Sequence, residues 1–174
     1  MKFGKIDIVN VLALGMLLAF SSCSKDDGAI PERVSIEDVP VITTNLESGG
    51  TAGTIALASQ ASFEGKFKVA LYFANALAPT KVDMVVRKNG SAANVKLFKA
   101  DVTTFPTSFS VKAADIVAIF GAPLTAKDTY DFAPDIFVKE KKYEAFPAVG
   151  NGNGQGITGM SAIGFGEYVR FTVN

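Results

Sequence analysis

Hydrophobic and polar residues alternate along most of the chain with the spacing of β-strands. In the segment 63–73 the odd-numbered positions are mostly Phe, Val and Leu, whereas the even-numbered positions include Glu64, Lys66 and Lys68. Because successive side chains of a strand point to opposite faces, this pattern predicts a strand with one buried and one solvent-exposed face. The same reasoning predicts strands over 39–44, 54–59, 81–88, 94–102, 108–112, 129–138, 142–146 and 167–173.

One stretch has helical spacing instead. Ile116, Ile119 and Phe120 recur as on one face of a helix, and Gly121 follows as a residue that commonly ends one. We therefore expect a short helix over 113–120. It would pack over one end of the strands through Ile116 and Phe120, and it would link strands of different sheets.

Asn89-Gly90 lies between two of the predicted strands, 81–88 and 94–102. Both residues tolerate a positive φ, which makes this dipeptide a strong turn signal. The sequence therefore predicts a hairpin here. Asn89-Gly90-Ser91 also matches a glycosylation sequon, but turn chemistry is the simpler explanation.

Many short strands with little helix predict the fold class. We expect an all-β, antiparallel, immunoglobulin-like β-sandwich of about 7–9 strands in a single domain over 39–174, with the short helix at 113–120. A closed barrel is the alternative. The paired cysteines and core Trp of antibody domains are missing, so the expected likeness is one of architecture.

The N-terminal part follows a different pattern. Lys2 and Lys5 precede an apolar run from residue 8 to residue 20, and two small residues come before Cys23. This pattern predicts a secretory signal over 1–22, because the apolar run is shorter than the roughly 20 residues of a membrane span. The polar segment that follows Cys23, up to residue 38, is expected to be a flexible tether.

Two short motifs at the cysteine resemble bacterial lipoprotein signals. Leu18-Ala-Phe-Ser-Ser-Cys23 resembles the lipobox, which implies acylation of Cys23, although Phe20 stands where that pattern more often has Leu. Ser24-Lys25-Asp26-Asp27 resembles the export signal of Bacteroidota lipoproteins. This resemblance implies anchoring in outer-membrane lipid with the domain facing the cell exterior, and an acidic tether without signal function is the alternative.

The composition excludes several classes of function. The chain has 17 basic and 17 acidic residues, so it lacks the electrostatic footprint of a nucleic-acid-binding protein. It has no His and one Cys, which excludes Ser-His and Cys-His catalysis, zinc chemistry and an intrachain disulfide. We expect no cofactor and no bound metal.

Carboxylates gather in the late strands, at Asp128, Asp131, Asp135, Glu140 and Glu144. Two carboxylates held in a cleft can hydrolyse glycosides. These, however, alternate with lysines between residues 139 and 142, a pattern typical of a solvated face. We therefore expect no catalytic residue among them.

A loop rich in Gly and Asn follows at 150–156. It offers amides and backbone carbonyls but no carboxylate, so a calcium site is a weaker interpretation than a surface loop that borders a ligand.

Tyrosines are the remaining candidates for ligand contacts, because sugar-binding sandwiches stack rings on exposed aromatic side chains and this chain has no Trp. The four candidates are Tyr72, Tyr130, Tyr143 and Tyr168. Packing against a neighbouring strand is the alternative role for each ring.

Segments 81–90, 94–102, 107–115 and 143–146 together resemble the small sandwich-domain lipoproteins of gut Bacteroidota, including the N-terminal domain of SusE-like glycan-binding proteins. The resemblance covers roughly 30–174. It implies a non-enzymatic surface lipoprotein that assists binding or uptake of a polysaccharide or another macromolecule beside a SusC/SusD-type transporter. SusE-like proteins carry additional C-terminal binding domains, so a structural spacer or protein-interaction module is the alternative.

Overall fold

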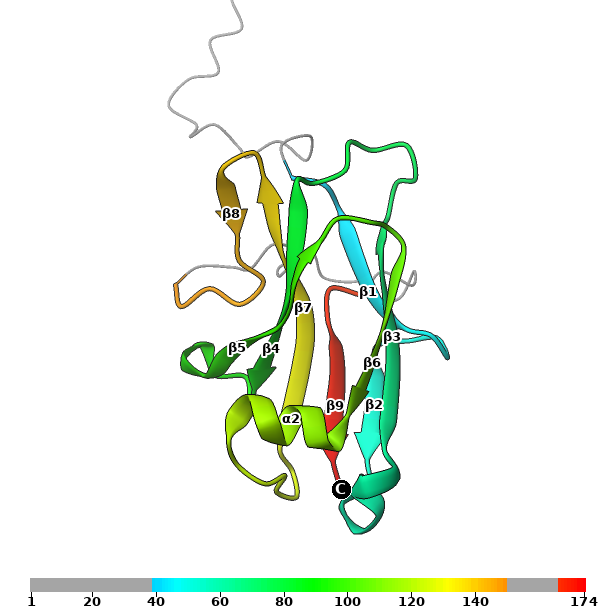
Figure 1. Ribbon diagram of the computed structural model, residues 1–174, viewed down its shortest axis with the longest axis vertical. Helices are drawn as coiled ribbons and strands as arrows, with labels where there is room; N and C mark the ends of the chain where they lie inside the picture. Colours follow the sequence, from blue (N-terminus) through cyan, green and yellow to red (C-terminus); the bar gives the residue numbers. More distant parts are fainter. Residues whose placement is uncertain (1–38, 150–165) are drawn as a thin grey trace, which may run out of the picture. The chain divides into compact units, whose positions relative to one another are not determined.

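A computed structural model describes residues 39–149 and 166–174 of the chain. The predicted signal, Cys23, the motif Ser24–Asp27 and the loop 150–156 lie outside the described residues. Within them the chain forms nine β-strands, one α-helix and two short 3₁₀ helices. Figure 1 shows the strands arranged as two layers with helix α2 across one end.

The smaller sheet has the strand order β1-β3-β6 and is antiparallel throughout. The larger sheet has the order β2-β9-β7-β4-β5, and β8 also pairs with β7. The strands are β1 (Ile42–Leu46), β2 (Ala52–Ile55), β3 (Glu64–Leu71), β4 (Lys81–Lys88), β5 (Val95–Val102), β6 (Thr107–Lys112), β7 (Thr129–Val138), β8 (Lys141–Tyr143) and β9 (Val169–Val173). The helices are η1 (Leu57–Ser62), η2 (Ala92–Asn94) and α2 (Ala113–Phe120).

This arrangement confirms an all-β sandwich with one short α-helix. The order β9-β7-β4-β5 opposite β1-β3-β6 matches the way immunoglobulin-like sandwiches divide their strands between two sheets. One pairing differs from the prediction, because β2 runs parallel to β9, with Ala52 opposite Arg170 and Ile55 opposite Val173. The described strands thus form an antiparallel sandwich with one parallel pair.

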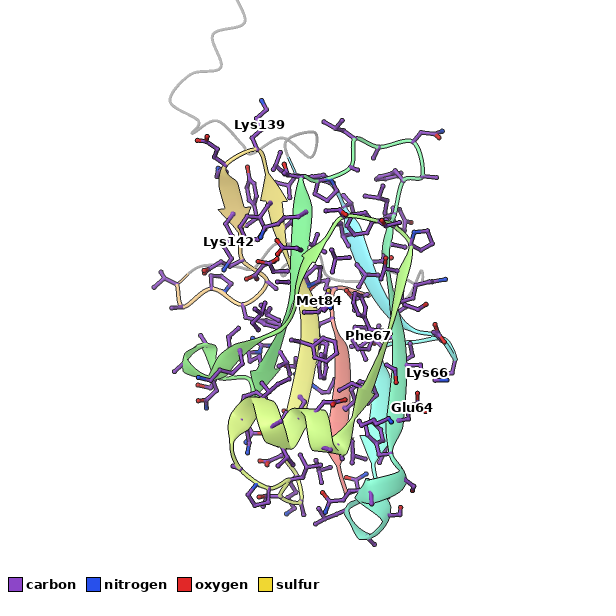
Figure 2. All side chains as sticks on the ribbon, in the orientation of Figure 1. Glu64, Lys66, Phe67, Met84, Lys139 and Lys142 are labelled. Atoms are coloured by element: carbon purple, nitrogen blue, oxygen red, sulfur yellow. The ribbon has the colours of Figure 1, made fainter. Side chains whose placement is uncertain are left out.

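The core between the sheets is built from aromatic rings. Phe67 on β3 is fully buried, and its ring centroid lies 5.3 to 6.1 Å from those of Phe98, Phe109 and Phe132. Met84 on β4 is also fully buried, and Figure 2 shows Phe67 and Met84 in the interior. The alternation over 63–73 therefore predicted the buried face of β3 correctly.

The ring of Phe171 lies over two glycines, one from each sheet. A Cβ atom added to Gly53 on β2 or to Gly65 on β3 would lie 2.6 to 2.7 Å from this ring, closer than side chains pack. Glycine at both positions therefore leaves room for this ring, and Gly65 lets β3 lie close to β9.

Helix α2 joins β6 of the smaller sheet to β7 of the larger one, as predicted. The backbone N–H of Lys112 donates to Asp115 at 2.8 Å at its start, and Gly121 ends it with a φ of 65°. Ile116 is fully buried, and the ring of Phe120 packs on Tyr130 at 5.5 Å. The helix thus closes one end of the core through the two residues expected to do so.

The predicted hairpin is confirmed. Asn89 and Gly90 adopt φ angles of 53° and 68°, and β4 pairs with β5 on either side of them. Two predicted strands, 54–59 and 142–146, extended three or more residues past their actual ends. The segment from residue 57 forms η1, where Ala, Ser and Gln favour strands weakly, and β8 ends at Tyr143 because the chain then crosses the outer face of the larger sheet.

Candidate functional site

The outer face of the larger sheet is covered rather than open to solvent. Strand β7 is buried from Tyr130 to Ile136, on both of its faces. A small apolar cluster forms on the outer side, where Ala145 and Phe146 of the segment after β8 pack on Val85 and Ala133. The segment 144–148 therefore lies as a strap over this face.

Asp131 is the charged centre beneath this cover, with a side chain that is fully buried. Arg170 donates to its two oxygens from Nε at 2.6 Å and from Nη2 at 3.0 Å, and Arg87 donates from Nη2 at 2.9 Å. The hydrogen bond to Asp131 raises the pKa of Arg170. The guanidinium of Arg87 also stacks on Phe146, with its carbon 3.9 Å from the ring centroid. Both carboxylate oxygens are therefore occupied in a structural contact.

Asp135 fixes the strap to the sheet. Its Oδ1 accepts the backbone N–H of Ala145 at 2.8 Å, and its Oδ2 lies 2.8 Å from the ammonium of Lys142. The hydrogen bond to Asp135 raises the pKa of Lys142. Because its two oxygens hold the two ends of 142–145, Asp135 determines where this segment crosses the outer face.

Asp128 has a similar structural role at the end of the sheet near α2. It receives hydrogen bonds from Asn89, from the backbone N–H of Thr125 and from the hydroxyl of Tyr130, and it pairs with Lys88 at 2.8 Å. Burial alone would raise the pKa of Asp128, but the hydrogen bonds from Lys88 and Asn89 outweigh it and lower the pKa below its ordinary value.

These contacts correct the prediction that the late carboxylates form a solvated face. Asp128, Asp131 and Asp135 are 8%, 0% and 4% exposed, whereas Glu140 and Glu144 are exposed as expected. The prediction considered the lysines that lie close in sequence. Two of the partners of the buried carboxylates, Arg87 and Arg170, come instead from the neighbouring strands β4 and β9.

A groove of about 440 Å³ opens beside the strap, between it and strands β4 and β5. Charged side chains line it at Asp83, Lys96, Asp135, Lys142 and Glu144, and its apolar wall is formed by Val85, Val95, Leu97 and Phe146, with Ala92 and Ala148 at its edges. Leu97 is 55% exposed although it lies within a strand, so the groove presents an apolar surface next to charged groups.

The four predicted tyrosines do not come together, and none of them lines this groove. Tyr130 is 1% exposed, which corrects the expectation that its ring stacks on a ligand: the ring belongs to the core under α2. Tyr143 and Tyr168 are half-buried, with Lys141 4.7 Å from the centroid of the former and Arg170 5.3 Å from that of the latter. Tyr72 is 39% exposed at the end of β3.

The groove itself was missed by the sequence analysis, although two signals pointed to it. Val85 interrupts the alternation of β4 with an apolar outward residue, and Val95 and Leu97 do the same in β5. Apolar residues on both faces of a strand indicate that both faces are covered. The aromatic residue of the groove, Phe146, belonged to a segment predicted as strand.

No helix within residues 39–149 and 166–174 is both long and apolar enough to cross a membrane. In the same part of the chain, no three His, Cys, Asp or Glu side chains come together as ligands for a metal ion. No protein-family model matches this chain, and neither a curated protein nor a solved structure is significantly similar to it.

Proposed function

We propose that the protein is a non-enzymatic lipoprotein of the outer membrane, anchored through Cys23, whose sandwich domain binds a glycan in the groove over β4 and β5. The motif around Cys23 and the acidic segment after it support the location. The groove of about 440 Å³ is the observation on which the binding role depends. Such a protein would assist capture or uptake of the glycan beside a SusC/SusD-type transporter.

The chemistry of the groove supports a sugar ligand. Sugars present hydroxyl groups at their edges and C–H groups on their faces, so they need hydrogen-bonding and apolar groups side by side. Glu144 and Lys96 offer the first kind of contact, and Leu97 and Phe146 offer the second. The volume also lies within the range of about 300–1,000 Å³ that is typical of ligand sites.

The carboxylates in the groove favour binding over hydrolysis. A glycosidase needs one carboxyl group as acid and a second as base or nucleophile. Asp135 is committed to Lys142 and to the N–H of Ala145, and Asp83 accepts the backbone N–H of Asp101 at 2.8 Å and lies 3.3 Å from Lys81. These two residues therefore shape the groove rather than carry out acid–base chemistry.

Binding is tested by affinity gel electrophoresis of the mature protein against plant, host and microbial glycans. The double variant Leu97→Ala/Glu144→Gln changes two exposed groove side chains, so the fold is expected to persist while affinity for the retained glycan falls about tenfold, as for the loss of one good contact pair. Glu64→Gln, on the exposed face of β3, is the matched control and should bind normally.

Failure to retain the protein in any glycan gel would contradict the binding role and favour the spacer or protein-interaction module. Equal affinity of the groove variant and the control would place the ligand elsewhere. The anchor is tested separately by labelling with radioactive palmitate. The wild-type protein should incorporate label and fractionate with the outer membrane, and Cys23→Ala should do neither.

A further inference from the structure

Three large apolar side chains are exposed together in the loop between β3 and β4. Tyr72, Phe73 and Leu77 are 39%, 55% and 81% exposed. The rings of Tyr72 and Phe73 pack edge to face at 4.9 Å, so they project together. No charged residue occurs in the loop, from residue 72 to residue 80. The loop is therefore an uncharged tip that exposes three large apolar side chains.

A basic turn lies directly beside this tip. The backbone N–H of Lys139, in the turn between β7 and β8, donates to Oγ1 of Thr80 at 2.9 Å, and the backbone N–H of Thr80 donates to the carbonyl of Phe137 at 2.8 Å. Lys139 is exposed in this turn and Lys141 at the start of β8, with Glu140 between them. Figure 2 shows Lys139 extending from this end of the sandwich.

The chain also enters the sandwich at this tip. The backbone N–H of Tyr72 donates to the carbonyl of Val41 at 2.9 Å, and β1 begins at the next residue, opposite Leu71. Residues 24–38 separate Val39 from Cys23. If this segment is flexible, as its sequence predicts, it would span on the order of 20 Å. An anchor at Cys23 therefore keeps this end of the sandwich close to the bilayer.

We propose that the β3–β4 loop inserts Tyr72, Phe73 and Leu77 into the lipid interface of the membrane that holds Cys23, with Lys139 at the level of the headgroups. This inference depends on the lipid anchor of the proposed function. Tyr and Phe rings beside Leu are the side chains that enter a membrane interface, and lysines beside them are attracted to anionic headgroups. The loop is the second point of attachment, and it fixes the orientation of the sandwich on the membrane.

The size and chemistry of the tip favour a lipid membrane over a protein or a glycan as its binding partner. A stable protein interface buries about 800 Å² on each partner, which three side chains do not supply. A glycan needs hydrogen-bonding side chains, and the loop exposes mainly apolar ones. A shallow membrane contact needs little area, because the tether raises the local concentration of the interface to the millimolar range.

The test uses the absence of Trp from the natural chain, which makes a single introduced Trp an unambiguous reporter. The acylated mature protein carrying L77W is reconstituted in phosphatidylethanolamine–phosphatidylglycerol vesicles that contain brominated lipid. A61W, exposed in η1 at the other end of β3, is the matched control. We expect a blue shift and about twofold quenching for L77W, as for an interfacial side chain, and neither change for A61W.

Acylation is measured on the same preparation by mass spectrometry. An acylated protein whose L77W emission is unshifted and unquenched overturns the docking of the loop but leaves the anchor intact. A protein without acyl chains overturns the anchor and this inference together. A blue shift that appears only after detergent-solubilised outer-membrane protein is added also overturns it, in favour of a protein partner.

Discussion

The two faces of the larger sheet are buried by different means. On the inner face Met84 and Phe132 pack against rings from the smaller sheet, and burial rests on apolar contacts. On the outer face of the same strands Asp131 lies between Arg87 and Arg170, and Phe146 covers the guanidinium of Arg87. One strand, β7, supplies both kinds of residue in alternation.

The two faces therefore contribute differently: one mainly stabilises the fold, and the other mainly determines where the strap and the groove lie. Burial of apolar surface stabilises the fold in proportion to the area removed from water. A buried ion pair adds little beyond a hydrophobic pair of the same shape, but it costs several kcal/mol when one partner is removed. The inner face therefore supplies the free energy of folding, and the outer face determines where the strap and the groove lie.

The largest effect is expected in the inner core. Phe67→Ala removes a fully buried ring that packs against three others, so it should lower the free energy of unfolding by about 3–5 kcal/mol. Phe73→Ala, at an exposed ring, should change it by less than about 0.5 kcal/mol. Urea denaturation measures the free energy of unfolding of both variants. Similar losses of stability would contradict the conclusion that the inner core supplies the folding free energy.

A smaller but still large loss is expected on the outer face. Asp131→Ala leaves two guanidinium groups without their buried partner and should cost about 3 kcal/mol. Asp101→Asn is the matched control, because it removes an exposed ion pair with Lys81 at 2.7 Å that should be worth at most about 1 kcal/mol, and Asn tolerates the φ of 58° at this position. If the two variants unfold at the same urea concentration, the charges on the outer face are no more important than surface charges.

Acid should weaken the end of the sheet near α2, where Asp128 lies. The pKa of Asp128 is lowered in the folded protein, so its contribution is complete above the unfolded value of 3.8 and is lost as the pH falls through the lower folded pKa. Asp128→Asn should therefore be less stable than the wild type near neutral pH, and the difference should shrink below about pH 4. Thermal denaturation between pH 2 and 7 measures this, and a pH-independent difference would be the contrary result.

The smallest effect is expected where the inner face contains a polar atom. Oγ1 of Thr44 is buried and has no hydrogen-bond partner among the described residues. Thr44→Val removes this hydroxyl and should leave stability unchanged or raise it by less than about 1 kcal/mol. A clear loss in a thermal melt would mean that the hydroxyl has a partner outside the described part of the chain.

Alternation located several strands and their inner faces well. The bounds of β4 and β7 were found without error, and the buried face of β9, with Val169, Phe171 and Val173, followed from the same rule. The outer face could not be predicted in this way. The partners of Asp131 lie 44 and 39 residues away, and a carboxylate that alternates with apolar residues has the same pattern whether water or arginine covers it.

Tyr130 and the groove show the same limit. Tyr130 was expected on a ligand surface because Tyr is amphipathic, yet its hydroxyl donates to Asp128 at 3.2 Å while its ring stays in the core. The groove depends on a strap fixed by Asp135 and Ala145, which are ten residues apart and separated by a turn. Only the apolar outward residues Val85 and Leu97 marked it in the sequence.

The parallel pairing of β2 with β9 has a mechanical consequence. A force that pulls the start of β2 and the end of β9 in opposite directions acts along both strands. It loads all of their backbone hydrogen bonds in shear at the same time. These bonds include the one from the N–H of Arg170 to the carbonyl of Thr51 and the one from the N–H of Asn174 to the carbonyl of Ile55. An antiparallel hairpin pulled at its open end unzips one bond at a time. This edge of the sandwich is therefore built to resist pulling along the strands.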